Sequence, residues 1–216
     1  MARQAREKRP ALRVIRGPRK SEYWKMAFST DLPPSTLRDT PQRYGSVTRF
    51  LHWVIAGLIL LQLLGVVLKV TMGRESAAAP LIGLHAPTGT LLFVLIVIRL
   101  IWSFANRGNR PPHAPGLVGK AAMLGHLVLN VLMLVIPLLA LLRAWGGTRA
   151  FAPFGFEIFP ARETAIAWTG ELAGALHGEL GWIMAVLILG HVGMVIVHEK
   201  LWRDGTLSRM AGRKTG

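Results

Sequence analysis

The sequence contains no cysteine. Disulfides, thiolate-bound zinc, iron–sulfur clusters and haem attached covalently through a C-x-x-C-H motif are therefore excluded. Acidic residues are also scarce, with 11 Asp and Glu against 26 Lys and Arg in 216 residues. No carboxylate lies deep in an apolar stretch, and the histidines are spread over different stretches. A zinc site built from closely spaced ligands is therefore not predicted.

The excess of basic residues gives the chain a formal net charge of +15. Such a charge would suit nucleic acid, but the Lys and Arg lie almost entirely outside the apolar stretches. This distribution favours the anionic headgroups of membrane lipids as the partner. We therefore expect lipid contact and no nucleic-acid binding.

Four long apolar stretches make up most of the remaining chain, which is 51% hydrophobic overall. Each stretch is long enough to cross about 30 Å of hydrocarbon as a helix. Because a bilayer core offers no water to the backbone, only helices are expected there. The predicted spans are residues 47–70, 81–104, 121–142 and 172–197. The sequence therefore predicts an all-α membrane protein built as a four-helix transmembrane bundle.

The first 43 residues are basic, contain prolines and lack sustained periodicity. This composition predicts a largely disordered tail, residues 1–43, in front of a transmembrane domain of residues 44–213. The tail has no apolar core of the kind that a signal peptide needs. Met26 is an alternative to Met1 as the true start, because the residues after it lead directly into a short polar segment.

The orientation of the spans is predicted from their flanking segments. The tail, residues 107–120 and residues 200–214 are strongly basic, whereas residues 143–172 carry both signs. The positive-inside rule then places both termini of a multi-pass membrane protein in the cytoplasm, where anionic headgroups meet the basic segments. Aromatic side chains in the outer loop predict contact with the membrane interface: Phe151, Phe154, Phe156, Phe159 and Trp168.

Histidines near the ends of the spans are the candidate functional residues. A titratable imidazole in hydrocarbon is costly and usually functional. His177 and His191 are fourteen positions apart, which is about 21 Å along nearly the same helix face. That spacing suits two stacked metal centres, and paired imidazoles inside a bundle are typical of noncovalent haem. Depth alone pairs His52 with His191 on the cytoplasmic side and His85 with His177 on the outer side.

Small side chains next to these histidines support the pairing. The residue four positions on, which shares a helix face, is small after His85, His177 and His52 and would leave room for a porphyrin. These three neighbours are Gly89, Gly181 and Ala56. The alternative is that small residues only allow the helices to pack closely.

Other polar residues at the cytoplasmic depth compete for roles. His126 could replace His52 or His191 as a ligand, but the bulkier Asn130 follows four positions on, so contact with a haem propionate or a quinone is preferred. Arg49 and Arg99 are candidates to bind a propionate, or to snorkel to the interface. His113 and His198 are expected to be solvated.

Several short motifs combine into a family pattern. They are Arg43-Tyr44-Gly45, Leu51-His52-Trp53, Gly83-Leu84-His85, Leu124-Gly125-His126-Leu127, Leu176-His177-Gly178-Glu179-Leu180, Gly190-His191, and Trp202-Arg203-Asp204-Gly205-Thr206-Leu207 with Arg209-Met210. With them, residues 44–213 resemble the bacterial cytochrome b561 family of small dihaem membrane cytochromes. The resemblance implies a four-helix bundle with two haem b groups, axial ligands at the four paired histidines, and electron transfer to or from the quinone pool. A superoxide-to-quinone oxidase role is known in that family.

The function expected from these features is electron transfer in a respiratory chain. Two imidazoles on each iron leave no open position for oxygen chemistry. Oxidation of superoxide would require nearby positive charge, which Arg149 or Arg162 could supply. One alternative is the haem-bearing membrane anchor of a hydrogenase- or dehydrogenase-type complex, with a redox partner subunit. Another is a haem-free protein whose histidines carry protons. The sequence does not decide between an electron-transfer protein and a superoxide:quinone oxidoreductase.

Overall fold

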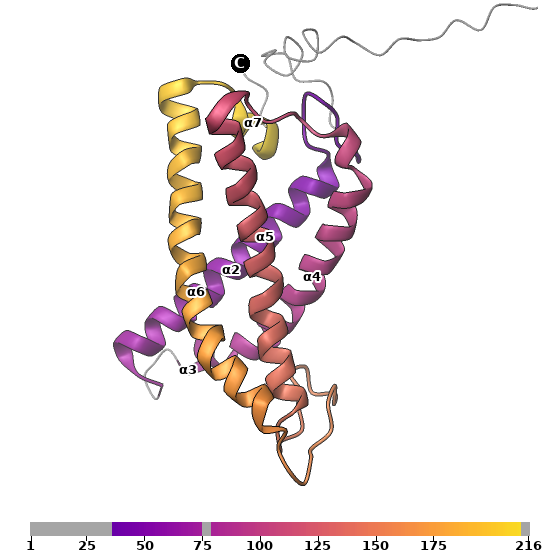
Figure 1. The fold of residues 1–216 in the computed structure, drawn as a ribbon, viewed down its shortest axis with the longest axis vertical. Coiled ribbons are helices and arrows are strands. Elements are labelled where there is room, and N and C mark those ends of the chain that lie inside the picture. Colours follow the sequence, from indigo (N-terminus) through magenta and orange to yellow (C-terminus); the bar gives the residue numbers. More distant parts are fainter. Residues whose placement is uncertain (1–35, 75–78, 213–216) are drawn as a thin grey trace, which may run out of the picture.

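The computed structural model describes residues 36–74 and 79–212, and the regular elements in this part of the chain are all helices. Its four long helices are α2 (Ser46–Met72), α4 (His85–Ala105), α5 (Gly116–Trp145) and α6 (Ala167–Ile196). All four are long and apolar enough to cross a membrane, so the predicted all-α fold with four membrane spans is confirmed. In Figure 1, α5 and α6 run along the long axis of the molecule, and α2 crosses behind them at an angle.

Short elements connect or end the long helices. They are α3 (Ala79–Gly83) before α4, the 3₁₀ turn η1 (Arg107–Asn109) after it, the π-helix η2 (Val197–Trp202) that extends α6, and α7 (Thr206–Ala211). The predicted second span, residues 81–104, is therefore interrupted between α3 and α4. Pro87 explains the break, because a proline ring clashes with the carbonyl group four positions earlier in a continuous helix. His85 consequently stands at the start of α4 and not inside a longer helix.

The helices pack as two pairs that are joined along one side. α5 packs along α6, α2 packs along α4, and α4 also packs against α5. Their shared core is apolar and draws on all four helices: Ile55, Ile59, Leu92, Ile96, Leu132, Met133, Ile136 and Met184. Within the described residues, α2 and α6 are not among the closely packed pairs. Space is therefore left between α6 and the α2–α4 pair.

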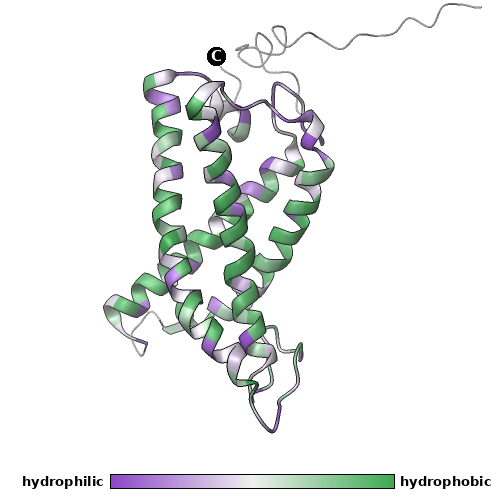
Figure 2. Ribbon diagram, viewed as in Figure 1, coloured by the Kyte–Doolittle hydropathy of each residue, from purple (hydrophilic) through white to green (hydrophobic). Residues whose placement is uncertain are grey.

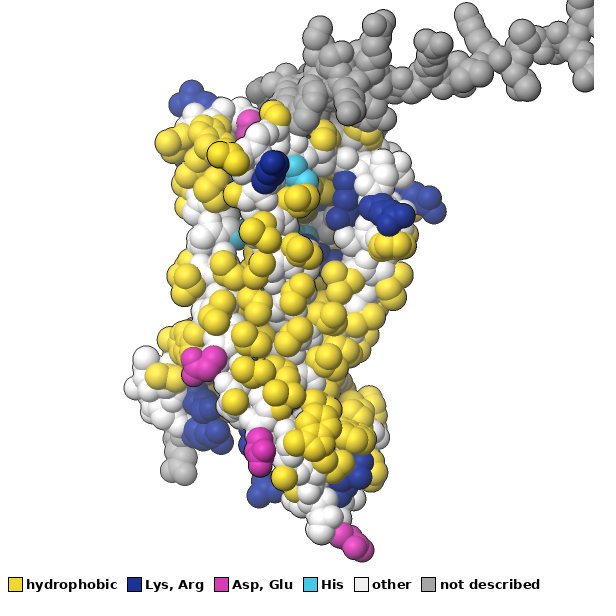
Figure 3. Space-filling model, viewed as in Figure 1, with side chains coloured by type: hydrophobic (Ala, Val, Ile, Leu, Met, Phe, Trp, Pro, Cys, Tyr) yellow, Lys and Arg dark blue, Asp and Glu magenta, His cyan; other side chains and the backbone are white. Residues whose placement is uncertain are grey.

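The outer surface of the bundle is apolar over most of its length. Only 6% of the most apolar stretch of α6 is buried inside the protein. Figure 2 shows hydrophobic residues along the middle of all four helices, and Figure 3 shows apolar side chains covering this face between charged ends. Such a surface suits lipid and not water.

The two ends of the bundle differ in what covers them. At one end, the indole Nε1 of Trp53 donates to the carbonyl oxygen of Met210 at 3.3 Å, which holds α7 against the start of α2. We call this the α7 end. The opposite end, which we call the α3 end, carries α3 and the connection between α5 and α6 (Figure 1). Both limits of the described chain therefore lie near the α7 end.

The tail predicted for residues 1–43 lies outside the described residues as far as residue 35, as does the alternative start Met26. The remaining residues, from 36 onward, turn back onto α2. The buried carboxylate of Asp39 accepts hydrogen bonds from the Gly45 backbone at 2.8 Å and from Thr48 Oγ1 at 2.6 Å. Its other oxygen pairs with Arg110 Nε at 3.2 Å. Asp39 therefore ties the entry of α2 to the connection between α4 and α5.

Candidate functional site

His85 and His177 lie together near the α3 end. His85 begins α4, His177 lies in the third turn of α6, and the centroids of their rings are 6.1 Å apart. His177 Nδ1 lies 2.9 Å from the carbonyl oxygen of Ile136. Because a carbonyl oxygen can only accept, Nδ1 carries the proton and Nε2 keeps its lone pair. A metal-binding imidazole is usually held in this way through its second nitrogen.

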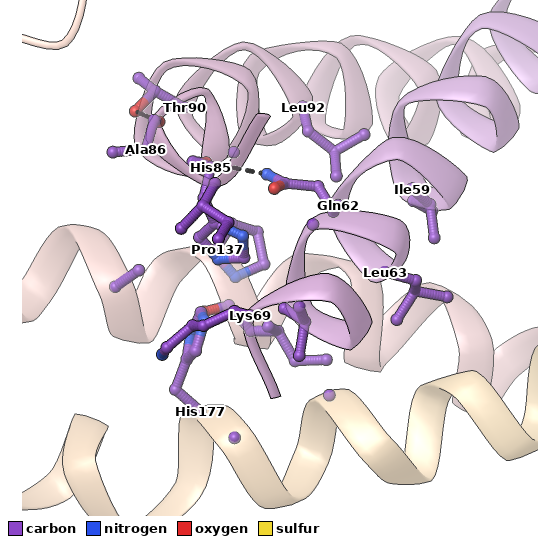
Figure 4. A pocket seen from close by; sticks show the side chains of 18 of the residues that line it. Ile59, Gln62, Leu63, Lys69, His85, Ala86, Thr90, Leu92, Pro137 and His177 are labelled. Carbon is purple, nitrogen blue, oxygen red and sulfur yellow. Dashed lines mark hydrogen bonds between the residues drawn. The ribbon is translucent and has the colours of Figure 1, made fainter. Parts of the chain in front are cut away.

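A cavity of about 520 Å³ surrounds this pair of histidines. Cofactor pockets in proteins are roughly 300–1,000 Å³ and mostly apolar, and this one fits both criteria. Side chains from α2, α4, α5 and α6 line it, including Leu63, Leu92 and Met133. Figure 4 shows His85 and His177 reaching into the same space from different helices. The gap between α6 and the α2–α4 pair is thus a lined pocket at this depth.

Two glycines of α6 keep one wall of the cavity flat. Gly178 and Gly181 line it, and a Cβ added at either would meet no other atom within 4 Å. The open space at Gly181 supports the interpretation that this residue makes room for a planar group. Gly89 has a different role, because a Cβ there would lie 2.9 Å from the amide nitrogen of Gln62. That nitrogen donates to the carbonyl oxygen of His85 at 2.9 Å.

The distance between the rings can be compared with that in a metal site. An imidazole nitrogen lies about 2.0–2.1 Å from a bound metal such as zinc, and the ring centre lies further back. Two rings on opposite sides of one ion therefore have centroids roughly 6 Å apart. Within the described residues, no group of three or more His, Cys, Asp or Glu side chains could hold a metal. A metal at such a pair needs further ligands from a cofactor, and porphyrin nitrogens provide four.

A second group of histidines lies toward the α7 end. The centroids of His52 and His191 are 6.5 Å apart, and those of His126 and His191 are 5.4 Å apart. His52 Nδ1 is buried without a hydrogen-bond partner in the described part of the chain. His113, expected to be solvated, is exposed, and the centroid of its ring lies 6.0 Å from that of His126. Both predicted pairs are thus brought together, and His126 stands beside one of them.

Positive charge gathers near this second group. Arg99 lies within electrostatic range of His52, His126 and His191. Arg49 lies elsewhere, against Gly212 after α7, where a Cβ would collide with its guanidinium. Of the two arginines predicted to contact a propionate, Arg99 is therefore the one close to the histidines. Burial raises the pKa of the nearby Tyr44 phenol.

The turn after α6 holds a hydrogen-bonded pair of His198 and Asp204 that the sequence does not predict. His198, expected to be solvated, lies with its Nδ1 2.6 Å from a carboxylate oxygen of Asp204. Burial raises the pKa of the Asp204 carboxyl, but hydrogen bonds from Thr206 and His198 more than offset this and hold it below its usual value. Asp204-Gly205 is a local turn signal, and the carboxylate of Asp204 accepts a hydrogen bond from the backbone N–H of Thr206 at 3.0 Å.

Comparison with known proteins adds an independent line of evidence. Residues 43–213 match the family model described as prokaryotic cytochrome b561. Two similar proteins of Escherichia coli (strain K12) are cytochrome b561 homolog 2, 31% identical over 82% of this chain and 95% of the relative, and cytochrome b561 homolog 1, 28% identical over 80% and 98%. A third, named probable superoxide oxidase CybB, comes from Yersinia pestis and is 24% identical over 81% of this chain and 99% of the relative.

Proposed function

Because the chain belongs to the prokaryotic cytochrome b561 family, we propose that it holds two b haems and passes electrons to or from quinone. Membership itself makes the protein a membrane electron-transfer protein that binds haem b. One haem is assigned to His85 and His177, and the other to His52 and His191. The observation that carries this assignment is the pair of facing imidazoles in a cavity of about 520 Å³.

The side chains around each proposed haem have separate tasks. A bound b haem supplies reversible one-electron oxidation and reduction. Imidazoles on both faces of the iron leave no position for oxygen to bind. The Ile136 carbonyl oxygen fixes the orientation of the His177 ring, and the apolar lining excludes water. Such a shell sets the potential through burial and ligand orientation.

The proposed membrane orientation places the α7 end in the cytoplasm. The described parts of the basic segments predicted to face inward, residues 36–45, 107–120 and 200–212, flank this end. Their Lys and Arg would meet anionic lipid headgroups there. The His52/His191 pair is then the cytoplasmic site, where Arg99 and His126 are available to a haem propionate or to quinone. The inner membrane of a bacterium is the compartment that this orientation requires.

Oxidation of superoxide is a second candidate, favoured by two cations at the His85/His177 cavity. In the balanced reaction, two superoxide anions each lose one electron to become O₂, and one quinone gains two electrons and two protons to become quinol. Lys69 and Arg74 line the cavity. Arg162, one of the two arginines expected to attract superoxide, instead places its guanidinium over the Trp145 ring at 4.7 Å. The other, Arg149, is not among the residues that line the cavity. Arg74 is therefore the better candidate to attract the anion.

The first test is a reduced-minus-oxidised absorption spectrum of the purified protein, with haem quantified per polypeptide. Two low-spin b haems per chain would support the proposal, and protein without haem would overturn it. Co-purification of a large soluble redox subunit would favour the membrane-anchor alternative. For superoxide, Arg74→Gln should slow haem reduction by a superoxide-generating system, whereas Arg149→Gln should not. Equal rates in both variants would argue against electrostatic attraction at Arg74.

A further inference from the structure

Among the described residues, the side chains at the His85/His177 cavity that carry a permanent charge are cationic. Apart from the two histidines, Lys69 and Arg74 are the charged side chains that line it, and no carboxylate does so among the described residues. Lys69 lies in the last turn of α2. Its side chain lies within electrostatic range of His85, and Figure 4 labels it together with His85 and His177 among the residues that line the cavity. An ammonium group therefore stands next to a proposed axial ligand.

Lys69 has no carboxylate within ion-pair distance in the described part of the chain, where the ion pairs are Arg110–Asp39 and His198–Asp204. The other cavity walls offer it little, because they are formed mainly by apolar side chains such as Ile59, Val66 and Ile136. A charge at an apolar wall requires a partner of opposite sign or contact with water. This ammonium group is thus available to an anion that enters the cavity.

A haem b brings two carboxylates into any cavity that it occupies. A carboxylate at an apolar wall gains most from a charge-assisted hydrogen bond. We propose that Lys69 binds a carboxylate of the haem held by His85 and His177, and that it raises both the affinity and the midpoint potential of that haem. This inference rests on the proposed function, because it requires haem at this pair of histidines.

The direction of the effect on potential follows from charge. Reduction adds one negative charge to the haem, and a nearby cation stabilises the more negative form. Loss of the Lys69 charge should therefore lower the midpoint potential of the nearby haem. His191 is fourteen positions from His177, about 21 Å along α6, so a haem held by His52 and His191 should keep its potential. If Lys69 only reached toward lipid headgroups, its replacement would change neither midpoint potential.

The test compares Lys69→Gln, Lys69→Arg and Arg149→Gln in the purified full-length protein. Arg149 is a matched control, because it is a cation of the α3 end that does not line the cavity. Two readouts are measured: the midpoint potentials from a spectroscopic redox titration, and the rate of haem loss to an excess of apomyoglobin. The haem at His52 and His191 reports in each sample that the bundle is folded.

In Lys69→Gln, one haem should have a lower potential and should dissociate roughly 10- to 100-fold faster, the factor that corresponds to a hydrogen bond between charged groups. Lys69→Arg should restore most of both values, and Arg149→Gln should match the wild type. Wild-type potential and wild-type haem loss in Lys69→Gln would overturn the inference. A separate variant, His177→Ala, tests the proposed function on which the Lys69 inference rests. Retention of both haems in His177→Ala would overturn the proposed function itself.

Discussion

His177 and Ile136 are joined by a hydrogen bond of 2.9 Å from the ring Nδ1 to the backbone carbonyl oxygen. The bond connects α6 to α5, the pair of helices that pack along each other. It therefore fixes the tautomer of His177 before any cofactor binds, and Nε2 keeps the lone pair that a metal needs. Rigid packing around a ligand of this kind supports tight binding, because little conformational freedom remains to be lost.

Replacement of His177 by alanine should remove one of the two haems. The cavity that contains His177 would lose one axial ligand, whereas the His52/His191 pair near the other end would be unchanged. Haem per polypeptide should fall by about half. His113→Ala is the control, because His113 belongs to neither predicted pair and should leave the haem content unchanged. Full haem content in His177→Ala would contradict the ligand assignment.

His52 and His126 can be distinguished as partners of His191. The 6.5 Å between the centroids of His52 and His191 is close to the roughly 6 Å expected for two rings on one ion. The 5.4 Å for His126 is shorter than that. His52→Ala should therefore abolish the low-spin bis-imidazole signal of one haem in electron paramagnetic resonance. His126→Ala should retain that signal, and the opposite pattern would make His126 the ligand.

The sequence predicts the membrane spans and the depth of the histidines, because the bilayer constrains both. Hydropathy identifies the spans, because a lipid-exposed backbone must satisfy its hydrogen bonds within the helix. The same reasoning gives each histidine a depth, and the structure brings His52 close to His191 and His85 close to His177. Pro87 is a local sequence signal for the break between α3 and α4, although the predicted second span, residues 81–104, continued through it.

Contacts between distant residues are the parts that sequence reasoning missed. Asp39 pairs with Arg110, 71 positions away, and no periodicity or spacing predicts that contact. Gln62 reaches the carbonyl oxygen of His85 because α2 packs along α4. Lys69 carried no such signal either, since a lysine in the last turn of an apolar helix ordinarily reaches the membrane interface. Its position at the cavity required the packed helices.

A larger side chain at Gly181 should exclude a planar cofactor from the cavity. Gly181 lines the cavity, and a Cβ there meets no atom within 4 Å, so that a leucine would occupy space assigned to haem. Gly181→Leu should lower the occupancy of one haem by at least half. Gly57→Leu is a matched control, because Gly57 also has open space around it but does not line the cavity. Equal haem loss in both variants would point to a general packing defect.

The proposed orientation can be tested with single cysteines, because the chain has none of its own. Lys120 is exposed at the start of α5, toward the α7 end, and Glu157 is exposed in the connection between α5 and α6. A thiol reagent that does not cross membranes should label Glu157→Cys in intact spheroplasts. It should label Lys120→Cys only after the cells are broken. The reverse labelling would invert the orientation.

The hydrogen bonds that Asp204 accepts from His198 and Thr206 should make the attachment of α7 dependent on pH. The carboxyl pKa of Asp204 is lower in the folded protein than its usual value near 4. Ionised Asp204 therefore stabilises the fold above about pH 4, and this contribution is lost as the pH falls through the folded-state pKa. Asp204→Asn should lower the free energy of unfolding by about 1 kcal/mol at pH 7.

Thermal unfolding in detergent, followed from pH 7 to pH 3, measures this contribution directly. The difference in melting temperature between the wild type and Asp204→Asn should narrow in the acid range. Protonation of Asp204 removes from the wild type the carboxylate charge that the substitution has already removed. Glu157→Gln provides the control, since this exposed carboxylate in the connection between α5 and α6 takes part in neither of the ion pairs within the described residues. A gap for Asp204→Asn that stays constant down to pH 3 would show that the carboxylate charge does not hold α7 in place.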